Sequence, residues 1–392
     1  MADIMNGTSF DQCIKCSICN VYCPVHNVTE KYPGPKHSGP DAERFRMKNP
    51  ALADPSLFYC SNCKRCETAC PSGVSITDMI MNARFKNRSA SRPAEFILSH
   101  TDLLGSMSVP FSRLVNFLLR RTMVKKIIAL AGISNKRTFP EYAAKKFSSL
   151  VQEGQQGDVT VFHGCYNNYN NHETIQSLDF VFEKLGISPG YTREKCCGVA
   201  LIANNFRDKA IKNARHNLAE FRKTSNEILF ISPSCMLAVT GEYRSLLELD
   251  NSDIRARSRF ITEYLVAEIR KRKPDMKPLD MKIAYHAPCH LEKTGHVGDS
   301  LELLKMIPGV ELINMNSGCC GIAGTYGFKT ANHDIAQAIG KNLFGLTKSI
   351  NPDYVATDCE TCKMQIDMST EKEALHPVVF LAMSMGFKPS SS

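Results

Sequence analysis

Short runs of β-branched and aromatic residues alternate with amphipathic stretches from about residue 156 onward. Four of these runs have the length and composition of buried strands, at residues 159–162, 228–231, 282–285 and 354–357. Between them, stretches such as 175–185 and 301–307 space their apolar residues as helices do. Strands that alternate with helices predict an α/β fold, in which ligand sites gather beyond the carboxyl ends of the strands.

The first 90 residues lack this alternation. Residues 41–46 are charged and compatible with a helix, and a second helix is predicted from about residue 75, where Ser75 or Thr77 is available as N-cap. Turn-forming Pro and Gly residues fill much of the stretch from 32 to 40. We therefore expect residues 1–90 to form a mainly α-helical module.

Residues 96–133 are rich in apolar side chains but also contain basic ones at positions 113, 120, 121, 125 and 126. The apolar residues between 111 and 119 share one side of a helix, and those after Thr122 follow a different phase, which predicts a break near residues 121–122. Two interpretations stay open. The helices pack on the protein's own core, as most amphipathic helices do, or they lie on a membrane with their basic side on anionic headgroups. No run of eighteen apolar residues occurs, so a transmembrane helix is not predicted.

The second half of the chain repeats its own landmarks, which are a His before a Cys, a Cys-Cys-Gly motif and a further Cys. They occur at His163, Cys165, 196–198 and Cys235, and again at His286, Cys289, 319–321 and Cys359 with Cys362. The offset between matching Cys residues is about 123 to 127 positions. This repeat predicts two related α/β domains at residues 156–277 and 278–388. Residues 91–155 would form a helical, partly amphipathic linker from the N-terminal module.

The seventeen Cys residues carry the clearest chemistry. Two runs near the N-terminus, each spaced C-x2-C-x2-C-x3-C and followed by Pro, are typical of ferredoxins with two [4Fe-4S] clusters. In such proteins the fourth Cys of one run ligates the other cluster. The spacing therefore predicts one cluster on Cys13, Cys16, Cys19 and Cys70, and a second on Cys60, Cys63, Cys66 and Cys23. Zinc, the alternative, prefers two separated Cys pairs.

Each repeat carries a further set of thiols. The second repeat offers five, one more than a cubane cluster or a zinc ion needs: Cys289, Cys319, Cys320, Cys359 and Cys362. Ser232 stands where another Cys would complete the first repeat, which offers four: Cys165, Cys196, Cys197 and Cys235. Adjacent Cys residues are poor disulfide partners, so a cluster is expected in the second repeat. A cluster, zinc or no metal stays open for the first.

Five more residues are singled out by their position beside these thiols. Gly198 and Gly321 would let the backbone adopt a positive φ or pass close to a bulky cofactor. His163, His286 and His290 would either tune a metal centre through hydrogen bonds or cap loops at strand ends.

Composition narrows the classes of function. The net charge of +9 is spread over 392 residues without a nucleic-acid-binding signature, so nucleic acid is not an expected partner. The first ten residues lack the basic and apolar regions of a secretory signal, which predicts a reducing cytoplasm and thiols that bind metal. No G-x-G-x-x-G follows a predicted strand, so a flavin is not expected and a partner would supply hydride chemistry.

The residues alone leave three classes of protein open. The first is an electron relay, which moves electrons between partners through its clusters. The second is an enzyme in its own right, a disulfide or quinone reductase whose chemistry occurs at the Cys residues of the second repeat. The third is a scaffold with structural zinc in both repeats.

The motif formed by Cys289, residues 319–321, Cys359 and Cys362 resembles the cysteine-rich CCG domain of heterodisulfide reductases and related iron-sulfur subunits. A helical two-cluster ferredoxin followed by two CCG domains is similar to glycolate oxidase iron-sulfur subunits. It is more similar still to the iron-sulfur subunits of anaerobic glycerol-3-phosphate dehydrogenases. Stretches at 99–103, 195–198, 318–328 and 357–363 support this resemblance, which spans essentially the whole chain.

The resemblance implies an electron-transfer subunit without flavin and without dehydrogenase activity of its own. It would accept electrons from A- and B-type flavoprotein subunits that oxidise sn-glycerol 3-phosphate, and deliver them to menaquinone. Its location would be the cytoplasmic face of the inner membrane, in peripheral contact with anionic lipid. By resemblance the five thiols of the second repeat hold a noncubane [4Fe-4S] cluster, and Ser232 breaks that pattern in the first. The alternatives are the iron-sulfur subunit of a glycolate or lactate oxidase, and a catalytic subunit like that of heterodisulfide reductase.

Overall fold

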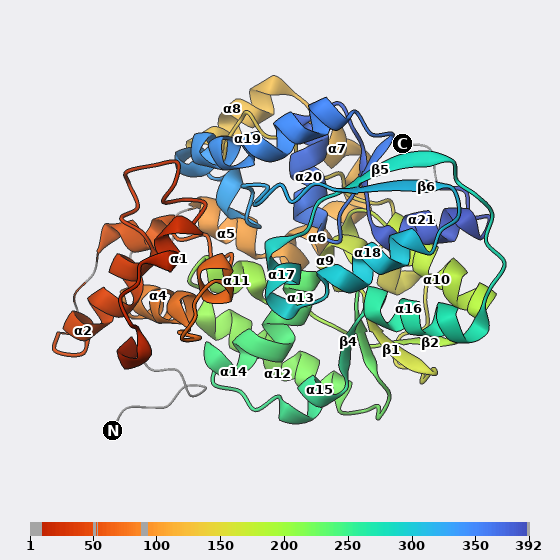
Figure 1. Cartoon of the computed structure of the whole chain (residues 1–392), viewed down its shortest axis with the longest axis horizontal. Coiled ribbons are helices and arrows are strands. Elements are labelled where there is room, and N and C mark those ends of the chain that lie inside the picture. Colours follow the sequence, from red (N-terminus) through yellow and green to blue (C-terminus); the bar gives the residue numbers. More distant parts are fainter. Residues whose placement is uncertain (1–9, 50–51, 53, 88–92, 390–392) are drawn as a thin grey trace.

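The structure is a computed structural model that describes residues 10–49, 52, 54–87 and 93–389. Residues 1–9, which make up most of the stretch predicted to lack a secretory signal, lie outside the described part. Residues 88–92, which contain the domain boundary predicted between residues 90 and 91, also lie outside it. Figure 1 shows the N-terminal module, in red and orange, on one side of the molecule and the two α/β regions on the other.

Each repeat forms a four-stranded parallel sheet, and the two sheets have the same strand order. The first has the order β2-β1-β3-β4, with β1 at Val159–Phe162, β2 at Pro189–Tyr191, β3 at Ile228–Phe230 and β4 at Ser258–Phe260. The second has the order β6-β5-β7-β8, with β5 at Met281–Tyr285, β6 at Val310–Asn314, β7 at Tyr354–Ala356 and β8 at Ala374–Leu375. In register, Val161 pairs with Leu229 and Ala284 pairs with Val355. The α/β prediction is confirmed, and the sequence repeat is a repeat of topology.

Helices begin directly after the central strands and carry the Cys residues of the repeats. In the first repeat these are α9 (Gly164–Tyr169) and α13 (Pro233–Leu237), whereas α11 (Val199–Ala203) follows the Cys-Cys-Gly motif and itself carries no Cys. In the second they are α17 (Cys289–Thr294) and α20 (Glu360–Ser369). Because all strands of a sheet are parallel, these helices start at one edge of each sheet. The thiols of each repeat therefore gather at that edge, as the strand pattern predicted.

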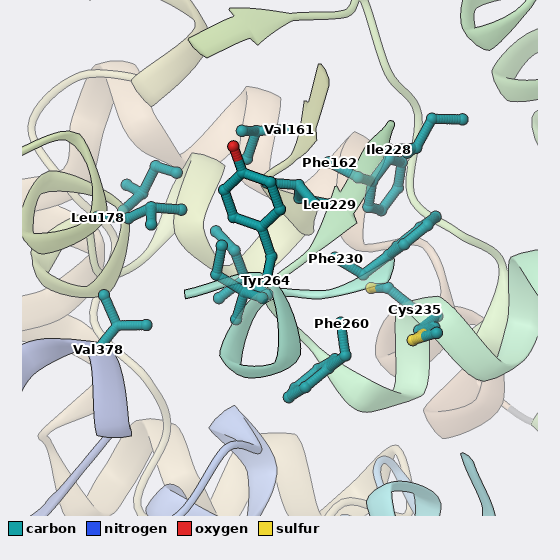
Figure 2. Packing of buried hydrophobic residues seen from close by; sticks show 14 of the residues in the cluster. Val161, Phe162, Leu178, Ile228, Leu229, Phe230, Cys235, Phe260, Tyr264 and Val378 are labelled. Carbon is teal, nitrogen blue, oxygen red and sulfur yellow. The ribbon is translucent and has the colours of Figure 1, made fainter. Parts of the chain in front are cut away.

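The remaining helices cover the sheets and share one continuous buried cluster. They include α10 (Glu173–Leu185), α12 (Arg207–Phe221), α14 (Tyr243–Ser245), α15 (Ser252–Ala256), α16 (Ile261–Arg272), α18 (Val297–Lys305) and α21 (Pro377–Ser384). Helix α19 (His333–Ile350) instead contributes Leu343 to a separate cluster with Ala284 and Val355 of the second sheet. Helix α21 of the second repeat packs against α10 of the first, and α18 packs against α16. Figure 2 shows Val378 of α21 beside Leu178 in the core around Phe162, Phe230 and Phe260. Residues on both sides of the boundary predicted at 277/278 thus contribute to one core.

The N-terminal module is built from short helices, as predicted, and from loops that carry Cys residues. Its helices are α1 (Ile18–Val21), α2 (Ala42–Arg46), α3 (Arg65–Thr68) and α4 (Ile76–Lys86), with helical turns at Phe10–Gln12, His37–Asp41 and Pro55–Tyr59. Helix α4 begins one residue after Ser75, where the sequence predicts a helix start. Its residues Ile76, Ile80 and Ala83 are buried beneath the Cys loops.

The segment between the module and the first sheet forms four helices, α5 (Pro93–Ser99), α6 (Thr101–Ser108), α7 (Ser112–Leu119) and α8 (Thr122–Leu130). The break predicted near residues 121–122 is confirmed. Part of the apolar side of α7 and α8 is not packed on the core, because Leu114 is 57% and Leu130 is 88% exposed. Among the described residues, no helix is long and apolar enough to cross a membrane.

Candidate metal centres

The thiols of Cys13, Cys16, Cys19 and Cys70, here called the Cys13 group, line one small cavity of about 20 Å³. Burial, together with the neighbouring thiolates of Cys13, Cys16 and Cys70, raises the pKa of the Cys19 thiol to about 11. The fold therefore brings Cys70 from the second run to the three short-spaced thiols of the first. Cys16 is exposed, so this group lies at the surface.

The thiols of Cys23, Cys60, Cys63 and Cys66, here called the Cys60 group, lie together deeper in the module. Burial raises the pKa of the Cys66 thiol well above its usual value, and the thiolates of Cys63, Cys60 and Cys23 add to the shift. All four are buried. Cys23 thus lies with the thiols of the second run and Cys70 with those of the first, and ligation of a cluster by each set stays a prediction.

The two Cys loops have the same backbone conformation. Lys15 and Ser17 have φ values of 59° and 65°, and Asn62 and Lys64, at the equivalent positions, have values of 54° and 63°. Left-handed conformations at non-Gly residues are uncommon and are retained where the surroundings require them. Backbone amides donate to the fourth thiol of each run, from His26 to Cys23 Sγ at 3.5 Å and in the same way to Cys70. Both loops thus turn their thiols inward around one point.

In the first repeat, Cys165, Cys196, Cys197 and Cys235 form the Cys165 group. Contact with Cys165 and then with Cys197 lowers the pKa of Cys196, and Cys235 lies beside Cys197. The backbone of Cys196 is fixed from both sides, because its N–H donates to Asp102 at 2.9 Å and its C=O accepts from Asn213 at 3.1 Å.

In the second repeat, five thiols form the Cys289 group: Cys289, Cys319, Cys320, Cys359 and Cys362. The Sγ atoms of Cys320 and Cys362 are 3.3 Å apart, and the amide of Gly321 donates to Cys319 Sγ at 3.3 Å. Contact with Cys362 lowers the pKa of Cys359 to about 6. A ring nitrogen of His286 and the Sγ atoms of Cys320 and Cys362 all lie within 4.8 Å of one another.

The residues beside the thiols have mixed roles. Gly321 has a φ of 90°, and a Cβ there would lie 2.0 Å from the carbonyl oxygen of Ala336 in α19, so helix packing accounts for this glycine. Gly198 has a φ of 91°, but a Cβ there would meet Ala210 at an ordinary 3.5 Å. Burial lowers the pKa of both His163 and His286 to about 4, so their rings are neutral.

The four groups fit iron-sulfur centres by the chemistry of their donors. A thiolate is the ligand form of Cys, and burial together with neighbouring thiolates makes that form unfavourable without a compensating cation. The Cys60 group concentrates four such thiols in a buried place, and the Cys289 group concentrates five. Iron bound there would supply one-electron redox chemistry.

Ser232 occupies the position at which a fifth Cys would complete the Cys165 group. Its hydroxyl donates to the carboxylate of Glu360 at 3.0 Å, and Glu360 belongs to the Cys359 loop of the other repeat. Nearby, His290 Nδ1 and the hydroxyl of Ser234 are 2.9 Å apart. The two repeats thus meet through the same loops that carry their Cys residues, and Figure 1 shows α13 and α17 next to each other at the centre of the molecule.

The loop of the Cys60 group lies between the two repeats. Asn62 donates to Glu242 of the first repeat at 2.8 Å, and Arg65 pairs with Glu292 of the second at 3.1 Å. Lys64 is buried among three carboxylates, those of Asp78, Glu67 and Glu242. Burial raises the pKa of Cys63, and the next largest contribution comes from the thiolate of Cys319. The Cys60 and Cys289 groups are therefore neighbours.

Two charged residues that lie beside the thiols of the Cys289 group were not predicted from the sequence. Arg65 faces Cys319, Cys63 and Cys289. Arg137 is completely buried near Cys320, and burial lowers its pKa to about 10 while the Cys320 thiolate opposes that change. Arg65 lies inside a Cys run, where a charge next to the ligands could have been suspected. Arg137 lies in no motif, and its partner Gln365 is 228 positions away, so no local pattern indicates it.

A module with two ferredoxin-like Cys loops and two α/β repeats with clustered thiols defines the class, an iron-sulfur protein that transfers electrons within a larger complex. Residues 9–74 match the family model for a 4Fe-4S dicluster domain, and residues 159–240 and 283–367 match that for a cysteine-rich domain. The chain is 44% identical to the C subunit of the anaerobic glycerol-3-phosphate dehydrogenase of Escherichia coli, over 97% of this chain and all of that one. It belongs to the family of these C subunits.

More distant relatives share the same organisation. The chain is 26% identical to the D subunit of a dihydromethanophenazine:CoB–CoM heterodisulfide reductase of Methanosarcina barkeri, over 93% of this chain and 90% of that one. It is 23% identical to the glycolate oxidase iron-sulfur subunit of Escherichia coli, over 93% and 91%. A crystal structure of a hypothetical protein from Helicobacter pylori has the same fold, with a TM-score of 0.51 at 11% identity, over 94% of this chain and 72% of that one.

Proposed function

We propose that this chain carries electrons from a flavoprotein that oxidises sn-glycerol 3-phosphate to menaquinone in the inner membrane. The observation that carries the proposal is the continuous series of thiol groups, from the exposed Cys16 through the Cys60 group to the Cys289 group. Membership of the C-subunit family supports the substrate and a hetero-oligomer with A- and B-type flavoprotein subunits.

Electrons would enter at the Cys13 group. Its loop exposes apolar side chains beside the thiols, with Ile14 at 67% and Val21 at 70% exposure. Exposed apolar residues that gather around a functional group are typical of a docking surface. A flavoprotein subunit bound there would bring its cofactor next to the exposed thiol, and the chain itself would need no flavin.

From there the electrons would pass inward to the Cys60 group and on to the Cys289 group. Cys70 of the second run belongs to the Cys13 group, and Cys23 of the first run belongs to the Cys60 group. This crossing would fix the distance between the metal centres of the two groups. Arg65 provides positive charge beside Cys63 of the Cys60 group and also faces the thiols of the Cys289 group. A nearby cation stabilises the more negative, reduced state of an iron-sulfur centre.

The cofactor content of the proposal is two [4Fe-4S] clusters in the N-terminal module and a noncubane [4Fe-4S] cluster on the five thiols of the Cys289 group. The Cys165 group, with four thiols, would hold a cluster or zinc. In the same proposal Gly198 and Gly321 shape the Cys-Cys-Gly loops around these centres.

Contact with the cytoplasmic face of the inner membrane would be made by α7 and α8. Their exposed apolar residues are Phe111, Leu114, Phe117, Leu118, Met123, Ile127 and Leu130. The same two helices and the turn between them expose Arg113, Arg120, Arg121 and Lys126. Apolar side chains flanked by basic ones favour a surface with anionic headgroups, to which each Lys or Arg contributes about 1 kcal/mol.

Metal analysis and spectroscopy of the anaerobically purified complex test the proposal. Addition of sn-glycerol 3-phosphate should produce the paramagnetic signals of reduced clusters, and menaquinone should remove them. Iron at about 12 atoms per chain, or more if the Cys165 group also holds a cluster, is expected, with one distinct signal lost in Cys320→Ser, whereas about 8 would confine clusters to the N-terminal module. Reduction by glycolate or lactate in place of sn-glycerol 3-phosphate would favour the hydroxy-acid oxidase alternative. A signal that responds to a disulfide substrate in the isolated chain would favour the heterodisulfide-reductase-like one.

A further inference from the structure

The Cys165 and Cys289 groups open into one shared cavity. The cavity has a volume of about 370 Å³, and all nine thiols of the two groups line it. Metal centres on these thiols would take up part of this volume. Volumes of this size are within the range of sites for small molecules and cofactors.

One part of this cavity is apolar and comes from the helices that precede the first sheet. Leu98 of α5, Leu104 of α6, Leu119 of α7 and Ile128 of α8 line it, together with Phe139. Polar side chains also line the cavity, among them Tyr166, Glu360 and Thr361. A cavity with a redox centre on the Cys289 group and with aliphatic and aromatic side chains in its lining fits a planar, apolar, redox-active ring.

The same helices connect the cavity with the exposed apolar surface. On α7, Leu119 lines the cavity while its neighbour Leu118 is exposed, and on α8 the same holds for Ile128 and Ile127. Each helix thus has one side toward the thiols and another toward the surroundings. An apolar ligand from a lipid phase would meet apolar side chains along this whole path.

We propose that the cavity between the Cys165 and Cys289 groups is the site where a lipid-soluble quinone is bound and reduced. The proposal rests on the proposed function, from which it takes the quinone and the reductant. Two electrons from sn-glycerol 3-phosphate arrive one at a time through the thiol-bound centres. Two protons from water bind the two ring oxygens, and the product is the quinol.

Tryptophan scanning with a matched control tests the site in the complete complex. Leu104→Trp fills the cavity, and Leu103→Trp adds the same ring to the adjacent residue of α6, which is exposed. With a short-chain naphthoquinone we expect Leu104→Trp to slow reoxidation of the reduced centres on the order of tenfold, because the added ring occupies the ligand's space. Reduction by sn-glycerol 3-phosphate should stay normal in both variants, and reoxidation should stay normal in Leu103→Trp.

A photoreactive naphthoquinone gives a readout that does not depend on turnover. Its label should map to peptides from α5 to α8 or to the Cys loops, and Leu104→Trp should lower the labelling. Normal reoxidation in Leu104→Trp with a label elsewhere would overturn the site and leave the proposed function intact. Wild-type centres that quinone does not reoxidise at all would instead overturn the proposed function. If Leu104→Trp lowers the iron content, Leu98→Trp replaces it, and the labelled peptides still decide the site.

Discussion

The side-chain amide of Asn62 donates a hydrogen bond of 2.8 Å to the carboxylate of Glu242, a residue 180 positions further along the chain. Glu242 is almost completely buried, and its second neighbour is the ammonium group of Lys64 at 3.6 Å. These contacts join the loop of the Cys60 group to the first repeat, while Arg65 of the same loop contacts the second. The loop therefore fixes the distance between the N-terminal module and both repeats.

Replacement of Lys64 tests this junction. Lys64→Met would leave the buried carboxylates of Asp78 and Glu242 without their cation, whereas Glu67 keeps Lys293, and such a loss typically costs about 3–5 kcal/mol. We expect a lower unfolding temperature and loss of the paramagnetic signal of the Cys60 group before that of the Cys13 group. Lys48→Met, which removes an exposed lysine from the same module, is the control and should change neither. Equal stability of the two variants would show that the carboxylates are protonated.

The two glycines that follow the Cys pairs provide a matched pair of substitutions. Gly198→Ala should cost about 1–2 kcal/mol, because its strain comes from a φ of 91° alone. Gly321→Ala adds a clash with the carbonyl of Ala336 to a similar φ and should cost more than about 3 kcal/mol. Denaturant unfolding of both variants, compared at equal iron content, measures the difference. A smaller loss for Gly321→Ala than for Gly198→Ala would contradict the packing argument.

Some of this arrangement follows from local pattern and some does not. The four central strands, the helix break before Thr122 and the crossed Cys sets were predicted, because each depends on residues near one another or on a fixed spacing. The edge strands β2, β4, β6 and β8 were missed, since two to five residues are too few to show a period. The exposure of Phe111 and Leu130 was also unpredictable, because amphipathic spacing does not say what covers the apolar side.

The effect of Arg137 on the reduction potential of a centre on the Cys289 group depends on the fold and not on a local sequence pattern. It lies completely buried beside Cys320 and packs over the ring of Phe328 at 4.8 Å. Arg137→Gln should lower the reduction potential of a centre on the Cys289 group by about 60 mV, since ~1.4 kcal/mol of lost attraction corresponds to that value for one electron. Redox titration followed by electron paramagnetic resonance checks it. Arg137→Lys, which keeps the charge, should restore most of the potential, whereas equal shifts in both variants would indicate a packing effect.

The pair of Asp179 and Tyr191 predicts a dependence of stability on pH away from the metal centres. Burial raises the pKa of Asp179 to about 6, although the hydrogen bond from the Tyr191 hydroxyl opposes the shift. The folded protein therefore binds this proton more tightly than the unfolded chain, and its stability falls as pH rises from about 4 to 6. Asp179→Asn should remove this loss and stabilise the protein by about 2 kcal/mol at pH 7, with little effect at pH 4. The free energy of unfolding of Asp179→Asn and of the wild type, measured at pH 4 and pH 7, tests this prediction. An equal gain in stability at both pH values would show that titration of Asp179 is not the cause.

Binding to lipid vesicles tests the surface formed by α7 and α8. Arg121→Glu with Lys126→Glu changes the charge by −4 on these helices, and Lys212→Glu with Arg215→Glu makes the same change on α12. Figure 1 shows α8 and α12 at opposite sides of the molecule. Since each basic residue near an anionic leaflet is worth about 1 kcal/mol, the first variant should bind vesicles of anionic lipid at least tenfold more weakly. The second variant should bind as the wild type does, and added salt should weaken wild-type binding. Equal losses in both variants would mean that net charge, and not this surface, directs the protein to the membrane.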